Sequence, residues 1–374
     1  MTMMTPSPLF DVERLGVLMA PEEANPLEVE GVLNPAGVAG PDGRYYLFPR
    51  LVAAGNYSRV GVARVIHDAA GRPIGVERLG VALEPETSYE IVRPGVGGCE
   101  DARVTYIPRL DRYVMAYTAL GRRGPHVALA SSRDLRSWTR HGLVDFAAED
   151  GTDFNLYANK DGMLLPEPVR APDGALALAM LHRPMYETWA GFDGEGSVPA
   201  SPPGGVDDDR PSMWISYCPL DRVDWLDGGS PGAGAAITAE NEPPRFAQHA
   251  LLATPQGEWE AYRIGGGTVP LRTPEGWLTF YHGVELYADG GRCYRTGALL
   301  LDRDDPRIVL ARSHEPVFGP ETAEERVGVV SNVVFPTAVD RRGESFDVYY
   351  GMADSRIGVV RLLFKAIVVE ECAA

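Results

Sequence analysis

Short apolar runs separated by turn residues recur along the whole chain of 374 residues. The runs are rich in β-branched and aromatic residues, as in 45–52 (YYLFPRLV) and 60–66 (VGVARVI), and Gly, Pro, Asn or Asp lies between them. The chain has 42 Gly and 31 Pro, so long amphipathic helices have no room. The pattern predicts an all-β fold.

Pairs of these runs form a block that returns five times without an intervening linker, at 42–68, 111–138, 174–225, 275–306 and 344–365. A repeated antiparallel unit is typical of a β-propeller, which buries its strands by stacking one repeat on the next. We therefore expect residues 1–374 to form a single five-bladed β-propeller; two tandem β-sandwiches are the alternative. Residues 191–211 are rich in Gly, Pro and Asp and are expected to form a loop insertion inside the third block.

The charge balance limits the range of partners. With 35 basic and 52 acidic residues the net charge is −17, which repels nucleic acids and anionic membranes. No run approaches the roughly 18 apolar residues of a spanning helix, and Asp11, Glu13 and Arg14 interrupt the N-terminal stretch where a signal peptide would be apolar. We expect no nucleic-acid or membrane partner and a cytoplasmic location.

Metal chemistry has little support in the sequence. The four cysteines are far apart without a CxxC pair, no two histidines are four residues apart as in HExxH, and no GxxxxGK[ST] segment is present. We expect no bound metal and no disulfide framework.

In a propeller the inner strands of all blades meet at one central channel, so polar residues that interrupt the apolar runs are candidates for the functional site. Each block carries such an interruption. They are Arg50, Asn56, Ser58 and Arg59; Glu100, Asp101 and Arg103; Asn159, Lys160, Asp161, Glu167, His182 and Arg183; Tyr281, His282 and Glu285; and Tyr349, Tyr350 and Asp354.

A series of segments from about Asn34 to Val360 resembles glycoside hydrolase family 130, the β-mannoside phosphorylases and related hydrolases. The most specific segments are Glu-Asp-x-Arg, Asn-Lys-Asp and Tyr-His-Gly, although Ala102 stands where family members usually carry proline. The full series is NPAGV, GCEDAR with VTYI, NKDGMLLPEPV, LHRP, IGGGTVPLRTPEGWLTFYHGV, TGALLLDRDDP, SNVVFP and VYYGMADSRIGV. The resemblance implies a five-bladed propeller and an inverting attack of phosphate on a β-mannosidic bond, giving α-mannose 1-phosphate.

An inverting hydrolase needs a carboxylic acid at the leaving oxygen and a second carboxylate that activates water, roughly 6.5 to 9.5 Å away. A phosphorylase needs only the acid, because phosphate is itself the nucleophile and cationic residues hold it in line. The resemblance implies that Asp101 is the acid and that its proton reaches the leaving oxygen through the 3-hydroxyl of the bound mannose. An isolated Asp-x-Arg segment is more often a turn with a surface ion pair, but the flanking glycines and the family resemblance favour the catalytic role.

For the phosphate, a guanidinium is well suited because it donates two parallel hydrogen bonds. Arg183 interrupts an apolar run and matches a basic family position, and Arg140 and Lys160 are further candidates. The remaining family position is open between Arg122, Arg123 and His126. Inorganic phosphate is the co-substrate, and no other cofactor is expected.

Hydroxyl-rich sugars need paired donors and acceptors beside an aromatic wall. One of the adjacent Tyr349 and Tyr350 is expected in the core, and Asp354 could instead cap a turn. The residues expected to contact the sugar are Asn34, Arg50, Ser58, Arg103, Asp161, Tyr281, His282, Glu285 and Asp354.

Two other functions stay open at this point. The first is an inverting β-mannosidase in which Glu285, Asp161 or Glu167 is the base. The second is a non-catalytic propeller that binds glycans or a protein. The expected partners are an oligosaccharide and phosphate, and the sequence leaves a homo-oligomer open.

Overall fold

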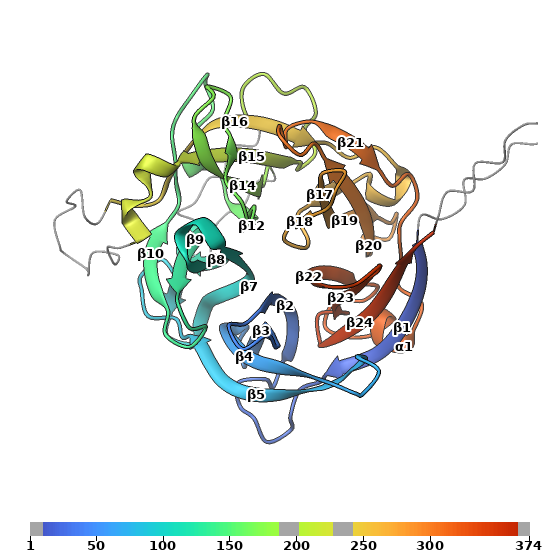
Figure 1. Cartoon of the computed structure of the whole chain (residues 1–374). Coiled ribbons are helices and arrows are strands. Elements are labelled where there is room, and N and C mark those ends of the chain that lie inside the picture. Colours follow the sequence, from blue (N-terminus) through green and yellow to red (C-terminus); the bar gives the residue numbers. More distant parts are fainter. Residues whose placement is uncertain (1–9, 187–201, 227–241, 366–374) are drawn as a thin grey trace, which may run out of the picture.

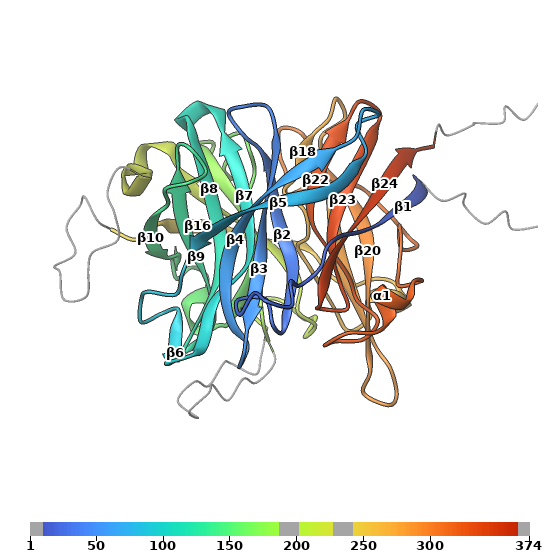
Figure 2. The same ribbon diagram turned by 90° about the horizontal axis from the view of Figure 1, so that it is seen from below.

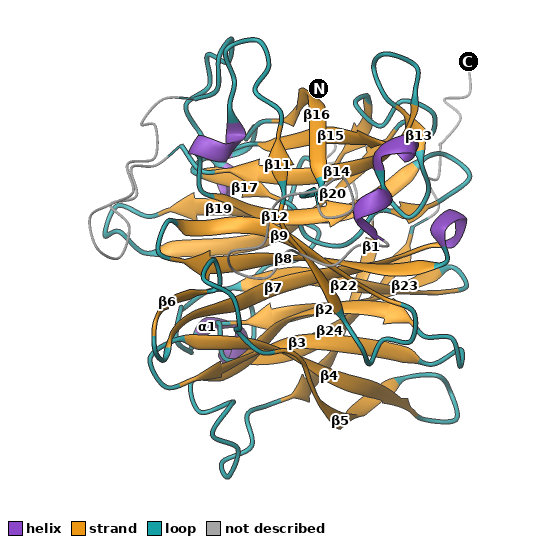
Figure 3. Ribbon diagram, turned by 90° about the vertical axis from the view of Figure 1, so that its left-hand side faces the viewer, coloured by secondary structure: helices purple, strands orange, loops and turns teal. Residues whose placement is uncertain are grey.

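The computed structural model describes residues 10–186, 202–226 and 242–365, which are mostly β-strand. The predicted all-β class is confirmed. In these ranges no helix is long and apolar enough to cross a membrane. Figure 3 shows the short helices at the ends of strands. They are α1 (Ala323–Arg326) and the 3-10 helices Pro108–Leu110, Phe154–Leu156, Leu220–Arg222, Asp224–Leu226 and Glu258–Glu260.

Most of the described strands pair antiparallel with a strand nearby in the sequence. They form five groups, which lie in a ring about a common axis (Figure 1). The first two groups join into one nine-stranded sheet through a short parallel contact between Ser58 and Gly98. The first contains β2 (Gly31–Ala39), β3 (Tyr45–Ala53), β4 (Tyr57–His67) and β5 (Pro73–Leu83). The second contains β6 (Ile91–Arg93), β7 (Val96–Ile107), β8 (Arg112–Gly121), β9 (Gly124–Ser132) and β10 (Thr139–Leu143).

The other three groups are separate sheets in the described ranges. The third contains β11 (Asp145–Phe146), β12 (Asn159–Leu164), β13 (Val169–Arg170), β14 (Leu176–Pro184), β15 (Met213–Pro219) and β16 (Arg245–Ala253). The fourth contains β17 (Arg263–Gly265), β18 (Leu271–Arg272), β19 (Trp277–Leu286), β20 (Arg292–Leu301) and β21 (Val309–Arg312). The fifth contains β22 (Val334–Arg342), β23 (Ser345–Met352), β24 (Arg356–Phe364) and β1 (Phe10–Met19).

The two ends of the chain meet in the fifth sheet, where β1 pairs antiparallel with β24 from Phe10↔Phe364 to Met19↔Ile357. Figure 2 shows β1 and β24 side by side. The first strand of the chain is thus the outermost strand of the last sheet, and this pairing closes the ring.

Burial follows the position of a strand in its sheet. All eight residues of β23 are buried, because neighbouring sheets cover both of its faces. The outer strand β5 is buried only at its two end residues and is half-buried or exposed between them, because one of its faces meets solvent. This difference explains why the second strand of each group carries the clearest apolar run.

The core consists of clusters between neighbouring groups. Phe48 of β3 and Met115 of β8 belong to one cluster, and Leu129 of β9 and Met180 of β14 belong to another. Two more clusters connect the third group to the fourth and the fourth to the fifth. A further cluster contains Leu47 and Val359, so the fifth group packs on the first. Each sheet therefore packs between two neighbours around the ring.

The predicted loop insertion at 191–211 lies between β14 and β15. Residues 191–201 lie outside the described residues, and 202–211 form turns and bends without a strand.

Candidate active site

Three strands next to the ring axis carry the same irregularity. The pairing register of β2, β7 and β12 shifts at Asn34, Asp101 and Asp161, respectively. The backbones of these residues are left-handed, with φ of 44°, 45° and 59°. Asn and Asp adopt this conformation more readily than most residues, and a β-bulge redirects a side chain out of the regular pleat. The bulges place the polar side chains of three different groups where the groups meet.

Asp101 of β7 is contacted by side chains of two other strands, β2 and β3. Its Oδ1 accepts a hydrogen bond from Asn34 Nδ2 at 3.0 Å and one from Arg50 Nη1 at 3.4 Å. Burial by itself would raise the pKa of Asp101, but Arg50, Lys160 and the hydrogen bond from Asn34 together outweigh it and hold the pKa below its usual value. Asp101 is therefore a carboxylate near neutral pH in the free protein.

Arg50 of β3 is held in place by several acceptors. Its Nε donates to Ser58 Oγ at 2.9 Å, and its Nη2 donates to Glu100 Oε1 at 2.8 Å and to Asn56 Oδ1 at 2.8 Å. Ser58 is buried, and its hydroxyl contacts Arg50. Glu100, which we did not assign a role from sequence, also pairs with Lys160 at 3.7 Å between Oε2 and Nζ. Its place next to Asp101 in the Glu-Asp-x-Arg segment is the signal that could have indicated it.

Lys160 and Arg183 are opposite each other in the pairing of β12 with β14. Arg183 is 4% exposed, and its Nε donates to Asp161 Oδ2 at 2.7 Å. Burial alone would raise the pKa of Asp161, but Arg183 and other nearby groups lower it to about 2. Arg183 Nη1 is buried and has no hydrogen-bond partner among the described residues. A buried donor without a partner is costly, so this nitrogen is available to an anion.

His282 of β19 completes this side of the cluster. Its Nε2 is 3.9 Å from Asp161 Oδ2, and its Nδ1 bonds the carbonyl of Gly266 at 3.0 Å. Burial lowers the pKa of His282 to about 3, so the imidazole is neutral. A Cβ on Gly265 of β17 would lie 2.3 Å from Asp161 Oδ2. Any side chain at this position would collide with Asp161, so the position requires glycine.

Asp354 reaches the cluster from the turn after β23, with a φ of 49°. The turn is fixed to β2, because Val32 N donates to Ser355 O at 3.2 Å. No hydrogen bond or ion pair joins the Asp354 carboxyl to any other described residue. Burial, followed by the charge of Asp101, raises its pKa to about 6.

Arg103 is almost fully buried beside Asp101, but its contacts are to the backbone. Its Nη1 donates to the carbonyls of Asp101 at 2.9 Å and Ala102 at 3.0 Å, its Nε donates to the carbonyl of Gly267, and its guanidinium lies over the ring of Phe335 at 5.5 Å. Arg103 therefore ties β7 to the segment after β17. Its Nη2 is buried and has no partner among the described residues, so its contact with the sugar stays a prediction.

Known proteins are similar to this chain in sequence and in fold. Residues 237–369 match the model of glycoside hydrolase family 130, described as β-1,4-mannooligosaccharide phosphorylase. A 1,2-β-oligomannan phosphorylase of Thermoanaerobacter sp. (strain X514) is 29% identical over 356 residues, which cover 94% of this chain and 96% of the relative. A β-1,2-mannobiose phosphorylase of Listeria innocua serovar 6a is 31% identical over 259 residues, or 69% of this chain and 56% of the relative.

The chain belongs to glycoside hydrolase family 130. The solved structure of the Listeria innocua β-1,2-mannobiose phosphorylase with β-1,2-mannobiose has the same fold, with a TM-score of 0.65 over 94% of this chain and 96% of that one at 22% identity.

In this family 130 chain, Tyr281 is not part of the cluster around Asp101. Its hydroxyl donates to Glu260 Oε2 at 2.8 Å and accepts from Arg312 Nε at 3.0 Å, and its side chain is fully buried. Side chains alternate between the two faces of a strand, so Tyr281 and its neighbour His282 point to opposite faces of β19. The predicted sugar contact of Tyr281 is replaced by a bond inside the fourth sheet.

Arg140 has the same kind of environment in the second group. Its Nε donates to Glu90 Oε1 at 2.9 Å, and the hydroxyl of Tyr117 donates to the same oxygen at 2.6 Å. Its Nη1 pairs with Glu86 at 3.1 Å, and its Nη2 donates to the carbonyl of Glu84. No contact among the described residues joins Arg140 to Lys160 or Arg183. The expectation that these three cations lie together does not hold.

This arrangement, which we call the Arg–Glu–Tyr clasp, occurs in three groups. In each, a fully buried Glu accepts the hydroxyl of a Tyr on the second strand and an Arg from the outermost strand, and also accepts two backbone N–H groups of the preceding loop. The clasps are Arg140–Glu90–Tyr117, Arg312–Glu260–Tyr281 and Arg14–Glu325–Tyr350. The repetition shows that Arg140 and Tyr281 stabilise their sheets.

The remaining predicted residues lie outside the cluster. Arg123 is exposed at the turn between β8 and β9, and His126 bonds only the carbonyl of Gly124, at 3.2 Å, among the described residues. Glu285 is paired with Arg295 at 2.6 Å. Glu167, one of the possible bases for hydrolysis, is exposed beyond the far end of β12.

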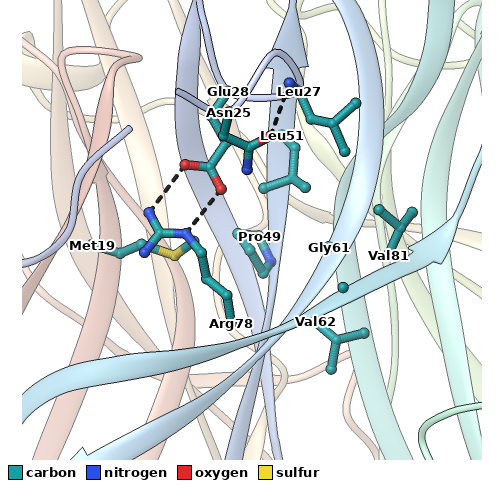
Figure 4. A pocket seen from close by; sticks show the side chains of 11 residues that line it. Met19, Asn25, Leu27, Glu28, Pro49, Leu51, Gly61, Val62, Arg78 and Val81 are labelled. Atoms are coloured by element: carbon teal, nitrogen blue, oxygen red, sulfur yellow. Dashed lines mark hydrogen bonds and ion pairs between the residues drawn. The ribbon is translucent and has the colours of Figure 1, made fainter. Parts of the chain in front are cut away.

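The pocket in Figure 4 is also separate from the cluster. It lies between β3, β4 and β5 and is lined by apolar side chains, including Leu51 and Val62. Its charged residues, Glu28 and Arg78, are paired at 3.0 Å. None of the predicted site residues lines it. In the described ranges, no group of three or more His, Cys, Asp or Glu side chains could hold a metal ion.

Proposed function

We propose that the chain is an inverting phosphorylase of β-mannosides, with α-mannose 1-phosphate as product. The observation that carries this proposal is the pair of cations on β12 and β14, in which Arg183 Nη1 is buried without a partner beside the weakly paired Lys160. The relatives support it, since those described above are named oligomannan and mannobiose phosphorylases.

The phosphate site of this proposal consists of Lys160 and Arg183. Lys160 has one distant carboxylate partner, at 3.7 Å, and Arg183 keeps a donor free after binding Asp161. A guanidinium that donates to both a carboxylate and a phosphate stays fully bonded when the anion binds. Arg140 belongs to a clasp and is not part of this phosphate site.

Asp101 is the proposed general acid. Phosphate oxygen attacks the anomeric carbon from the face opposite the leaving group, the bond from that carbon to the glycosidic oxygen breaks, and the oxygen takes a proton that originates on Asp101. By resemblance to the family, the proton passes through the 3-hydroxyl of the mannose. Asn34 and Arg50, which donate to Asp101, are proposed sugar contacts, together with Asp354 and with His282, which lies beside Asp161.

The proposal includes the architecture. Each of the five groups of strands is one blade of a five-bladed propeller, all in one domain, and residues 191–211 are an insertion in the third blade. The reaction requires phosphate as co-substrate and no other cofactor.

The test is to incubate the protein with β-1,2-mannobiose and β-1,4-mannobiose, each with and without inorganic phosphate. Products are measured as mannose 1-phosphate and free mannose, and Asp101→Asn is the control for catalysis at this site. We expect mannose 1-phosphate in α configuration, formed only with phosphate. Release of two mannose molecules per disaccharide in phosphate-free buffer would show a hydrolase, and binding without turnover would show a glycan-binding propeller.

A further inference from the structure

The first group contains two of the three residues of an Arg–Glu–Tyr clasp. Glu28 precedes the inner strand β2 and is 1% exposed. Its Oε1 accepts from Arg78 Nε at 3.0 Å, and its Oε2 accepts from Arg78 Nη2 and from the backbone N–H of Glu22, each at 3.0 Å. Arg78 belongs to β5, the outermost strand of the group. Glu28 and Arg78 therefore correspond to the Glu and Arg of the clasps.

The arginine also has the second contact that the clasps share. Arg78 Nη2 donates to the carbonyl of Ala20, in the loop before Glu28, at 2.7 Å. The clasp arginines donate in the same way to a carbonyl of the loop before their own Glu; they are Arg14, Arg140 and Arg312.

In the clasps of the fourth and fifth groups, the tyrosine lies opposite a glycine of the next strand. Tyr281 is opposite Gly297, and Tyr350 is opposite Gly358. A Cβ on Gly297 would lie 2.4 Å from the ring of Tyr281, and one on Gly358 would lie 2.7 Å from the ring of Tyr350. The glycine thus makes room for the ring.

The first group keeps this glycine but has no tyrosine beside it. The register of β3 with β4 pairs residue 47 with 63 and residue 50 with 60, which puts Pro49 opposite Gly61. No tyrosine hydroxyl of the described ranges is bonded to Glu28. The side chain of Leu51 covers part of Gly61, at 3.0 Å from the position of a Cβ. The rest of the space is the pocket of Figure 4.

This pocket is a cavity of about 70 Å³ with Glu28 and Arg78 among its lining residues. Its other walls are mainly apolar and consist of Met19, Leu27, Pro49, Leu51, Val62 and Val81. A closed apolar cavity of about 150 Å³ is known to bind benzene. This cavity is smaller, but the side chain of Arg78 is 26% exposed, so a ring can enter with its hydroxyl-bearing edge and keep its other edge at the surface.

The acceptor in the cavity is Glu28 Oε1. In the clasps of the second and fifth groups, the carboxylate oxygen that accepts the Arg Nε also accepts the Tyr hydroxyl, at 2.6 Å in both. Glu28 Oε1 accepts Arg78 Nε alone among the described donors. A carboxylate oxygen can accept two hydrogen bonds. Apolar walls with this acceptor at one end are complementary to a phenol.

We propose that this cavity binds a small molecule with a phenol group, whose ring takes the place of the missing tyrosine and whose hydroxyl donates to Glu28 Oε1. None of the residues that line the cavity belongs to the cluster around Asp101, so the inference does not depend on the proposed function. The ligand connects the loop before β2 with β3 and β5, and it stabilises the folded protein because it binds only the folded state.

The experiment is a calorimetric titration of the full chain with 4-methylphenol, which is the side chain of tyrosine as a free molecule. The matched ligand is 4-methylanisole, in which a methyl group replaces the hydroxyl hydrogen. We expect one saturable site for 4-methylphenol and at least about 10-fold weaker binding of 4-methylanisole, because a hydrogen bond to a charged acceptor is lost. Inorganic phosphate and β-1,2-mannobiose should not compete, since their proposed site lies elsewhere.

Two variants at one position test where the phenol binds. Pro49→Tyr puts the chain's own phenol into the cavity and should abolish the binding of 4-methylphenol. Pro49→Ala leaves the cavity open and should keep it. Unchanged binding in Pro49→Tyr would overturn the inference, because the phenol would then bind elsewhere.

Three further results would also overturn the inference. They are equal affinities for the two ligands, no saturable binding of 4-methylphenol, and competition by phosphate or mannobiose. If Pro49→Tyr does not fold, a crystal structure of the wild type soaked in 4-methylphenol decides the question. We expect the hydroxyl at about 2.7 Å from Glu28 Oε1, and a ring bound only at another place would refute the site.

Discussion

Arg140 and Arg312 occupy equivalent places in two different sheets. Each comes from the last strand of its group and donates to a buried Glu, which also accepts a Tyr hydroxyl, and each also donates to a backbone carbonyl of the preceding loop. Two residues with the same set of partners at two positions around the ring have the same role. Since only Arg140 was a phosphate candidate, the equivalence makes its assignment testable.

Arg140→Gln should lower the stability of the protein and leave phosphate binding unchanged. Removing one partner of a buried ion pair typically costs about 3–5 kcal/mol, because the other charge stays buried without compensation. Arg312→Gln is the matched control and should lower Tm by a similar amount. A rise in the KM for phosphate in Arg140→Gln, without the same rise in Arg312→Gln, would show that Arg140 contacts phosphate.

Arg183→Ala should raise the KM for phosphate by about 10- to 100-fold and change the KM for the mannoside much less. A charge-assisted hydrogen bond to the anion, worth about 1.5–3 kcal/mol, is lost while the contacts to the sugar stay. The measurement is initial rates over a grid of both substrates. An equal rise in both KM values would indicate that the loss of the ion pair with Asp161 distorts the whole site.

Asp101→Asn should reduce kcat at least about 10²-fold, because the amide cannot donate a proton as an acid does. The substitution keeps the shape of the side chain but removes the negative charge that Arg50 contacts, so we expect a lower Tm than that of the wild type at neutral pH. Thermal unfolding and turnover are measured on the same preparation. Near-normal turnover would show that another group is the acid.

Tyr281→Phe tests the contribution of the tyrosine hydroxyl to the clasp. The variant loses the hydroxyl that bridges Glu260 and Arg312, which should cost about 1–3 kcal/mol of stability since both partners stay buried. The KM values for phosphate and mannoside should be those of the wild type. Tyr117→Phe is the equivalent change in the second group, and a higher KM for the mannoside in Tyr281→Phe alone would indicate a sugar contact.

The sequence predicted the strands that are covered on both faces. The second strands of the groups, such as β8 and β19, read as continuous apolar runs and gave the repeat. The inner strands β2, β7 and β12 were harder to recognise, because a bulge at an Asn or Asp breaks their alternation. The pairing of β1 with β24 is not visible in any local pattern, because it joins residues more than 300 positions apart.

The sequence indicated the residues of the cluster around Asp101 where the polar residue lies in a bulge of an inner strand, as for Asn34, Asp101 and Asp161. They were misplaced where a polar residue lies in a second or outer strand, as for Tyr281 and Arg140. From sequence alone, a Tyr or Arg that interrupts an apolar run gives the same signal whether it faces the axis or a buried Glu. The loops before the clasps, such as PETSYE and PETAEE, are similar to one another, and this similarity was the available clue.

The pH dependence of stability should distinguish Asp354 from Asp161. The pKa of Asp354 is raised from its usual 3.8 to about 6, so the protonated carboxyl contributes stability that is complete below pH 3.8 and is lost as the pH rises through 6. Asp354→Asn cannot ionise and therefore escapes this loss, so it should have a higher Tm than the wild type at pH 8 and a similar Tm at pH 4.

The pKa of Asp161 is lowered to about 2, so its contribution to stability is complete above pH 3.8 and is lost only as the pH falls towards 2. Asp161→Asn should accordingly be less stable than the wild type at pH 8, with a difference that shrinks below pH 4. Melting curves of the three proteins across this range are the measurement, and a lower Tm for Asp354→Asn at pH 8 would show that the Asp354 carboxylate is stabilised in the folded protein.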